Sequence, residues 1–210
     1  RALRLLANES AGRARHLLHQ SDFIAAKLLG RGGHSDENNT LKLGYDPETQ
    51  SWPDWFEETG LNRDLLPEVH PAGAPIGTIA TDVAAGIGVS PNATIHAGTT
   101  DSIAAFLAAA PLETGVAVTS LGTTLVLKIL SDKRIDLPEM GLYSHKVGDV
   151  WLAGGASNTG GGVLAHLFTP EDLNDLSDRI DPDKPSSLDY YPLTRPGERF
   201  PVNDTNLQPR

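Results

Sequence analysis

The 210-residue chain contains no cysteine and only one methionine, Met140. Without thiols it cannot form a disulfide scaffold, use a thiol nucleophile or bind zinc through cysteine. Positive charge is also scarce, because 17 Lys and Arg stand against 27 Asp and Glu, for a formal net charge of −10. This balance argues against a general surface for nucleic acids or anionic membranes. No apolar run approaches the roughly 20 residues that a membrane span needs.

Glycine and proline are abundant, with 21 and 15 residues, above their usual combined share of roughly 12%. The hydrophobic fraction of 39% nevertheless indicates a folded, globular chain rather than a disordered one. The length suits one large domain or two small ones. Because the chain opens with Arg1 rather than Met, we expect a processed form or a part of something longer.

The first 75 residues predict helices and a long loop. Leucine spacing favours an amphipathic helix over residues 1–20, and a second helix over 23–29 follows a Ser-Asp cap and stops at Gly30. Residues 31–51 are polar and turn-rich, which predicts a surface loop able to cover a ligand. A short helix is expected over 52–59.

The pattern changes at residue 76 and again at Pro111. Short strands are expected over 76–79 and 93–97, and a helix over 101–110 is apolar enough to be buried. After Pro111, strand-like runs surround a three-residue turn, which predicts a β-hairpin over 116–130. A third strand is expected over 150–153, and the last forty residues are Asp- and Pro-rich with little periodicity.

Three segments could carry chemistry. Asp101 follows a strand and a Gly-Thr-Thr turn at the start of a helix, where it is either a normal helix cap or a carboxylate at a ligand cleft. The turn Ser120–Thr124 offers backbone amides and hydroxyls that can bind phosphate, although many hairpins carry Gly-Thr for the turn alone. Gly154–Gly162 has five glycines in nine residues before a helix, yet it matches neither a P-loop nor a dinucleotide fingerprint.

The order of these segments resembles the middle of an FGGY-family carbohydrate kinase, a member of the actin-like ATPase superfamily. Ala97–Ala105 resembles the segment that holds the family's catalytic Asp, and Ser120–Thr124 resembles its second phosphate motif. Gly155–Gly162 resembles its glycine-rich nucleotide segment. The tail from Tyr191 to Pro201 is similar to the plant and cyanobacterial ribulose and xylulose kinase branch.

The resemblance implies an α/β fold of the ribonuclease H-like, actin-like ATPase type, with parts of two domains flanking a cleft. Residues 1–111 would be the C-terminal part of the first, sugar-binding domain. Residues 112–210 would be the N-terminal part of the second, nucleotide-binding domain.

The implied reaction is ATP-dependent phosphorylation of a sugar hydroxyl, with ATP and Mg²⁺ as cofactors and Asp101 as the general base. Thr100, Asp101 and Ser102 would contact the sugar. The nucleotide would be bound by Gly122, Thr123, Thr124, Gly160 and Gly161. No residue is assigned as a direct metal ligand, and Asp101 would reach Mg²⁺ only through water. An aspartate is ionised at neutral pH but is a weak base, so it suits orientation and late proton transfer.

Two departures from the family limit these implications. Ser102 stands where many members have Gln or Asn, so the sugar stays open, with a ketopentose such as D-ribulose or D-xylulose favoured. The family's Asp-x-Gly-Thr phosphate motif and its C-terminal adenosine motif are missing from these residues. We therefore expect both to lie outside the chain, and the chain alone to be inactive as a kinase.

Other interpretations stay open. The chain could be a non-catalytic sugar- or nucleotide-binding module, or an actin-like phosphohydrolase in which Asp101 activates water. The expected partner is a small sugar, with no nucleic acid and no membrane, and a homodimer is left open. A cytoplasmic location is expected, with import into an organelle left open.

The remaining chemical side chains give weaker signals. The seven histidines are scattered, and no pair shows metal-ligand spacing with a carboxylate; His16 and His19 are expected to share an exposed helix face. Trp52 and Trp55 fit equally a sugar-stacking role and ordinary packing.

Overall fold

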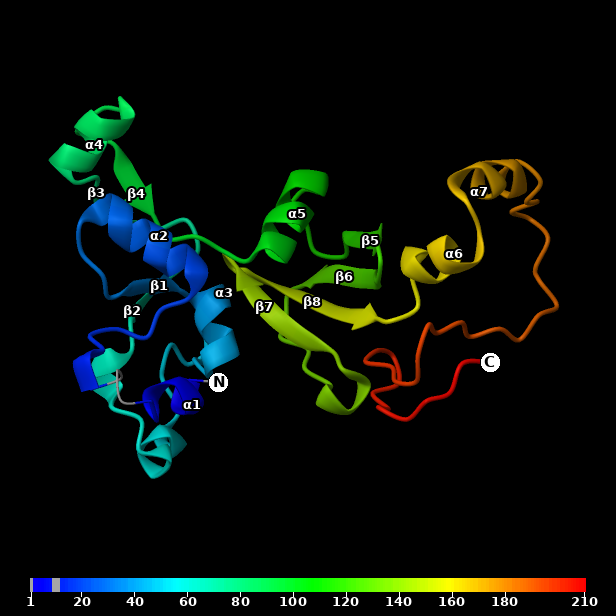
Figure 1. Ribbon diagram of the computed structural model, residues 1–210, viewed down its shortest axis with the longest axis horizontal. Coiled ribbons are helices and arrows are strands. Elements are labelled where there is room, and N and C mark those ends of the chain that lie inside the picture. The colour runs from blue at the N-terminus through cyan, green and yellow to red at the C-terminus, as the bar shows by residue number, and fades with distance from the viewer. Residues whose placement is uncertain (1, 9–11) are drawn as a thin grey trace. The chain divides into compact units, whose positions relative to one another are not determined.

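The computed structural model describes residues 2–8 and 12–210. Its contacts divide the chain into two compact units (Figure 1). Unit 1 comprises Arg1–Ala108 with His145–Asp149, and unit 2 comprises Ala109–Ser144 with Val150–Arg210. Among the described residues, every helix is too short or too polar to cross a membrane.

The N-terminal part of unit 1 differs from its predicted long helix. Helix α1 covers only Ala2–Leu6, and residues 9–11 lie outside the described part. Residues 14–19 are not helical, so the prediction that His16 and His19 share a helix face is wrong. Helix α2 spans Gln20–Leu29. His19 caps it, and its backbone N–H donates to Asp22 Oδ2 at 2.8 Å. Gly30 ends it in the left-handed conformation with φ of 70°, as predicted.

The predicted surface loop over 31–51 is wrong for its central part. Strand β1 (His34–Asp36) leads into the short helix α3 (Glu37–Thr40) and a 3₁₀ turn, η2 (Leu41–Leu43). All six residues from Ser35 to Thr40 are buried although all are polar. Strand β2 (Glu68–His70) pairs with β1 in parallel, which brings His34 opposite Glu68.

The rest of unit 1 contains the strands predicted over 76–79 and 93–97, with bounds that differ by one residue. Short 3₁₀ helices cover Asp54–Thr59 (η3) and Arg63–Leu65 (η4). An antiparallel pair of strands, β3 (Pro75–Thr78) and β4 (Thr94–His96), encloses helix α4 (Thr81–Ile87). A small apolar core joins this pair to α2 through Leu29, Ile76 and Ala97.

Helix α5 spans Asp101–Ala109 and begins at the predicted residue. Its burial is less than predicted, because only Ile103 and Phe106 are buried and Leu107 is exposed. The apolar face of α5 is therefore one stripe rather than the whole helix.

A sheet with strand order β5-β6-β8-β7 follows along the chain, and all of it except the end of β7 from His145 belongs to unit 2. The strands are β5 (Ala117–Leu121), β6 (Leu125–Ser131), β7 (Tyr143–Val147) and β8 (Val150–Ser157), and a 3₁₀ turn, η5, covers Pro138–Met140. The β5–β6 hairpin is confirmed, with Leu121 opposite Leu125 across the turn. Strand β7 was not predicted, and β8 extends to Ser157, so Gly154 and Gly155 lie in a strand rather than a loop.

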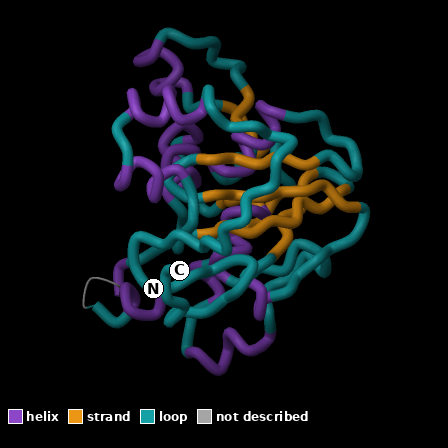
Figure 2. Tube along the Cα trace, turned by 90° about the vertical axis from the view of Figure 1, so that its right-hand side faces the viewer, coloured by secondary structure: helices purple, strands orange, loops and turns teal. Residues whose placement is uncertain are grey.

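Helices α6 (Gly161–Leu167) and α7 (Pro170–Ser177) follow the sheet (Figure 1). The remaining chain has neither helix nor strand, in keeping with its sequence, and Figure 2 shows loop at the C-terminus. It is nevertheless held in place, because Glu198 of this tail accepts the backbone N–H of Asn158, just after β8, at 2.7 Å.

Candidate functional site

In unit 1, Asp101 is the first residue of α5 and is exposed. One carboxylate oxygen, Oδ1, accepts the backbone N–H of Ser102 at 2.8 Å. The helix is initiated by Thr100, whose carbonyl accepts the N–H groups of Ile103 and Ala104. Asp101 is therefore both part of the helix start and accessible to a ligand.

The other two residues predicted to contact the sugar, Thr100 and Ser102, differ in their exposure to solvent. Ser102 is exposed, whereas Thr100 is buried, with its Oγ1 3.5 Å from Ser102 Oγ. The geometry thus leaves Asp101 and Ser102 open at the surface and gives Thr100 the position of a support beneath them.

The loop before Asp101 rests on the buried polar segment of β1 and α3. Asn38 Nδ2 donates to Thr99 Oγ1 at 3.2 Å, and a Cβ on Gly98 would lie 4.0 Å from Asp36 Oδ2. Asn38 is itself fully buried. The position of the Gly98–Thr100 turn therefore depends on residues more than sixty positions earlier.

Asp36 organises this segment. Its Oδ1 accepts the backbone N–H groups of Asn38 and Asn39 at 2.9 and 2.8 Å, and its Oδ2 accepts Asn39 Nδ2 at 2.7 Å. Burial raises the pKa of Asp36, these hydrogen bonds lower it in part, and nearby Asp22 raises it further. Burial also raises the pKa of Glu37. Both carboxyls are therefore costly to ionise inside unit 1.

In unit 2, the turn Gly122–Thr124 is joined to the start of α6. Gly161 donates its N–H to the carbonyl of Gly122 at 2.8 Å, and Gly162 donates to that of Thr123 at 3.2 Å. These two amides are thus used inside the protein, and the anion contact that a glycine-rich helix start can offer does not come from them.

The glycines are required for this approach. A Cβ on Gly160 would lie 2.6 Å from the backbone carbon of Thr124, and one on Gly161 would lie 2.8 Å from the oxygen of Gly122. Side chains at these positions would push the hairpin turn away. The structure therefore gives Gly160 and Gly161 a direct contact with the predicted phosphate turn.

A cavity of about 340 Å³ opens beside this turn in unit 2. Its lining residues are Thr123, Thr124, Asn158, Gly162, Val163, Thr194 and Arg195. Three threonine hydroxyl groups and a guanidinium group line it, and such groups suit the oxygen atoms of a phosphate. The sequence interpretation named Thr123 and Thr124, and Asn158 lies within its glycine-rich segment, but it missed Thr194 and Arg195, which only the fold brings to the turn.

Asn158 is held by a buried carboxylate, Glu198. Glu198 accepts the Asn158 N–H at 2.7 Å, Ser157 Oγ at 2.6 Å and Tyr191 OH at 2.7 Å. Burial alone raises the pKa of Glu198, but the hydrogen bonds from Ser157, Asn158, Tyr191 and Arg199 outweigh it and lower the pKa to about 2. The Gly-Glu-Arg run in the tail was the sequence signal for this group, although its role was not predicted.

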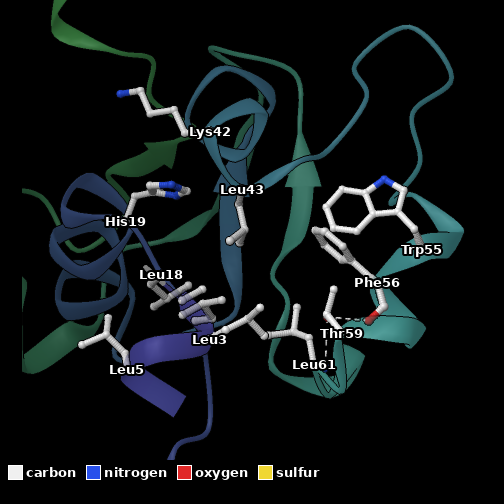
Figure 3. Close-up of a pocket in the computed structure, with 12 residues that line it drawn as sticks. Leu3, Leu5, Leu18, His19, Lys42, Leu43, Trp55, Phe56, Thr59 and Leu61 are labelled. Atoms are coloured by element: carbon white, nitrogen blue, oxygen red, sulfur yellow. Dashed lines mark hydrogen bonds between the residues drawn. The ribbon is translucent and has the colours of Figure 1, made fainter. Parts of the chain in front are cut away.

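A second cavity, of about 470 Å³, lies in unit 1 (Figure 3), and its lining includes Trp55 but none of the residues predicted to bind the sugar or the nucleotide in the kinase interpretation. Its lining is mainly apolar, with Leu3, Leu43 and Leu61 around Trp55 and Phe56. Trp55 and Trp52 both pack on Phe56, at ring-centroid distances of 4.5 and 5.7 Å. Their observed contacts are thus those of an aromatic cluster.

No family model matches the chain. Residues of the chain are 30% identical over 134 positions to the "Putative sugar kinase YoaC" of Bacillus subtilis (strain 168), covering 63% of this chain and 27% of that protein. The chain therefore spans about a quarter of the length of this curated relative.

Solved structures resemble the chain over almost its full length. A xylulose kinase from Brucella ovis has a TM-score of 0.85 at 22% identity and covers 99% of this chain and 45% of that one. A gluconate kinase from Lactobacillus acidophilus has a TM-score of 0.80 at 20% identity, over 97% and 44% of the two chains. These likenesses show the fold, which is the predicted α/β, actin-like ATPase fold.

Proposed function

We propose that the chain is part of an ATP-dependent carbohydrate kinase that phosphorylates a sugar hydroxyl. The observation that carries the proposal is the turn Gly122–Thr124, whose two threonines line one cavity with Arg195. The shared fold and the sugar-kinase relative support it. A ketopentose such as D-ribulose or D-xylulose is the proposed substrate.

In this proposal Asp101 orients the sugar hydroxyl and accepts its proton through the carboxylate oxygen that Ser102 N–H leaves free. Ser102 contacts the sugar, and Thr100 supports the loop from below. Phosphoryl transfer depends mainly on positioning and on stabilising charge on the transferred oxygens. A weak base is sufficient for a proton that leaves late in the reaction.

The unit 2 residues would bind the phosphates of ATP. Thr123 and Thr124 donate hydroxyl hydrogen bonds, Gly122 shapes the turn, and Arg195 offsets negative charge. Gly160 and Gly161 keep the turn in place by allowing α6 to approach it. Mg²⁺ would accompany the triphosphate and supply further positive charge, with water between it and Asp101.

The test is a coupled assay of ADP release against a sugar panel that starts with D-ribulose and D-xylulose. It uses the longest reading frame that contains these residues, with the 210-residue chain measured beside it. We expect sugar-dependent ADP release from the former and none from the latter, because the Asp-x-Gly-Thr motif is missing from the 210 residues.

Asp101→Asn should abolish sugar phosphorylation and leave nucleotide affinity and the melting temperature unchanged. Asp82→Asn is the matched control, since Asp82 is also exposed in the first turn of a helix in unit 1. Near-normal turnover by Asp101→Asn would remove Asp101 as the base. ADP release without sugar would favour a phosphohydrolase, and binding without turnover would favour a binding module.

A further inference from the structure

Three side chains of metal-ligand type gather on the β1–β2 pair of unit 1. The parallel register places His34 opposite Glu68, and His70 follows two positions later on the same face of β2. His34 and His70 are 36 positions apart in the sequence, which is why no ligand spacing was visible there. The proposed kinase function uses none of the three.

Their polar atoms are close enough to share one ion. His34 Nδ1 lies 3.0 Å from His70 Nε2 and 3.4 Å from Glu68 Oε2, and His70 Nε2 lies 3.8 Å from Glu68 Oε1. In a tetrahedral zinc site with ligand bonds of about 2.0–2.1 Å, neighbouring ligand atoms stand about 3.3 Å apart. The three observed distances fall around this value, so binding would need only small movements, together with a shift of the proton in the hydrogen bond between the two rings to another ring nitrogen.

The surroundings suit a site that is held by the protein but open to solvent. The side chains of His34 and His70 are 11% and 18% exposed, whereas that of Glu68 is 68% exposed. The two rings lie 5.2 Å apart between centroids. The imidazoles are therefore fixed by packing, and the carboxylate faces the side from which an ion would arrive.

We propose that His34, Glu68 and His70 form a binding site for a divalent metal of the zinc class, which links β1 to β2. Two imidazoles and one carboxylate favour Zn²⁺ over Mg²⁺ or Ca²⁺, which prefer oxygen ligands. Three protein ligands leave one position of a tetrahedral ion to water.

The charges near the site are mixed. Burial, followed by Arg31 and His70, lowers the pKa of His34, which keeps its ring in the neutral form that binds metals. Arg31 also repels a cation, and the negative charge of Glu68 counteracts it. Because β1 ends at Asp36, an ion at this site would also restrain the strand that leads into the buried polar segment.

The test titrates chelator-treated 210-residue chain with Zn²⁺ alone, followed by calorimetry and thermal melting. We expect about one equivalent of Zn²⁺ to bind and, at 100-fold excess over Kd, to raise Tm by about 5–10 °C. Mg²⁺ at the same concentration should leave Tm unchanged. Absence of stoichiometric Zn²⁺ binding by the native chain would overturn the proposal.

Variants locate the ion. His70→Gln and Glu68→Gln should lose the Zn²⁺-dependent rise in Tm, while His166→Gln, which changes an exposed histidine of α6, should keep it. Glu68→Gln decides the matter if His70→Gln fails to fold, because the Glu68 side chain is largely exposed. Zn²⁺ affinity in Glu68→Gln equal to that of the native chain would place the ion elsewhere.

Discussion

Asp36 in unit 1 and Glu198 in unit 2 are equally buried, with 1% and 2% of their surface exposed, yet their acidities shift in opposite directions. Burial raises the pKa of Asp36, with Asp22 adding to the rise. At Glu198 the effect of burial is reversed by hydrogen bonds that lower the pKa to about 2. Burial alone therefore does not decide whether a carboxyl stays charged; the donors and charges around it do.

The two carboxylates have similar places in their units. Asp36 fixes the segment that carries Asn38, which bonds to Thr99 two positions before Asp101. Glu198 fixes Asn158, two positions before Gly160. Each unit thus supports its predicted site loop on a buried acid, but only unit 2 does so on a well-stabilised anion.

The largest expected effect comes from removing that anion. Glu198→Ala leaves the donors of Ser157, Tyr191 and Asn158 without their acceptor, and we expect unit 2 to lose about 4 kcal/mol of unfolding free energy. Urea unfolding measures it. Glu198→Gln should lose less, because it keeps one acceptor oxygen, and equal stability of Glu198→Ala and the native chain would refute the role given to Glu198.

The pH dependence should have opposite signs in the two units. Glu198 has a lowered pKa when folded, so it stabilises unit 2 above its unfolded value of 4.5 and loses about 3 kcal/mol as the pH falls from there to about 2. Asp36 has a raised pKa when folded, so unit 1 gains stability as the pH falls from neutral to the unfolded value of 3.8.

Hydrogen exchange at pH 3–7, read separately on the amides of each unit, measures both slopes. Glu198→Gln should reduce the loss of stability of unit 2 at acid pH. Asp36→Asn should remove the gain of stability of unit 1 as the pH falls. A change of stability with pH that has the same sign in both units would contradict the comparison.

A smaller change removes one of the hydrogen bonds that keep the pKa of Glu198 low, whereas that of Asp36 is raised. Tyr191→Phe removes the hydrogen bond of 2.7 Å to Glu198 Oε2, and we expect a loss of about 1.5 kcal/mol, as for a hydrogen bond to a charged group. The pKa of Glu198 should rise, which carboxyl chemical shifts would follow. Tyr190→Phe is the control, since the side chain of Tyr190 is exposed; equal losses in both variants would exclude the specific bond.

The smallest expected effect concerns the loop support in unit 1. Asn38→Ala removes the bond to Thr99 and should cost about 1 kcal/mol, because one hydrogen bond between neutral groups is lost. Asn92→Ala, at an exposed position of the same unit, should cost close to nothing. Amide exchange at Thr99 and Thr100 should accelerate only in Asn38→Ala.

Local signals predicted local structure well. The hairpin around Gly122–Thr124, the stop at Gly30 and the start of α5 at Asp101 all depend on residues within a few positions of one another. The motif order was also sufficient to predict the actin-like fold. The functional roles of Asp101 and the phosphate turn stay predictions.

Long-range contacts account for what was missed. The polar run Ser35–Thr40 looks like surface loop because its burial depends on β2 and on the loop at Thr99. Arg195 reaches the phosphate turn only through the path of the tail, and the His34, Glu68 and His70 cluster exists only because β1 and β2 pair. Polarity predicts exposure only where no partner is available.

The bond from Gly161 N–H to the Gly122 carbonyl also has a consequence for the order of folding. The hairpin depends on local contacts, so we expect it to form early. Closing the long loop to α6 costs chain entropy, so we expect this bond to form after β6 has paired with β8. We therefore expect the phosphate turn to reach its final shape after the sheet has formed. The protection of one glycine amide would report that last step.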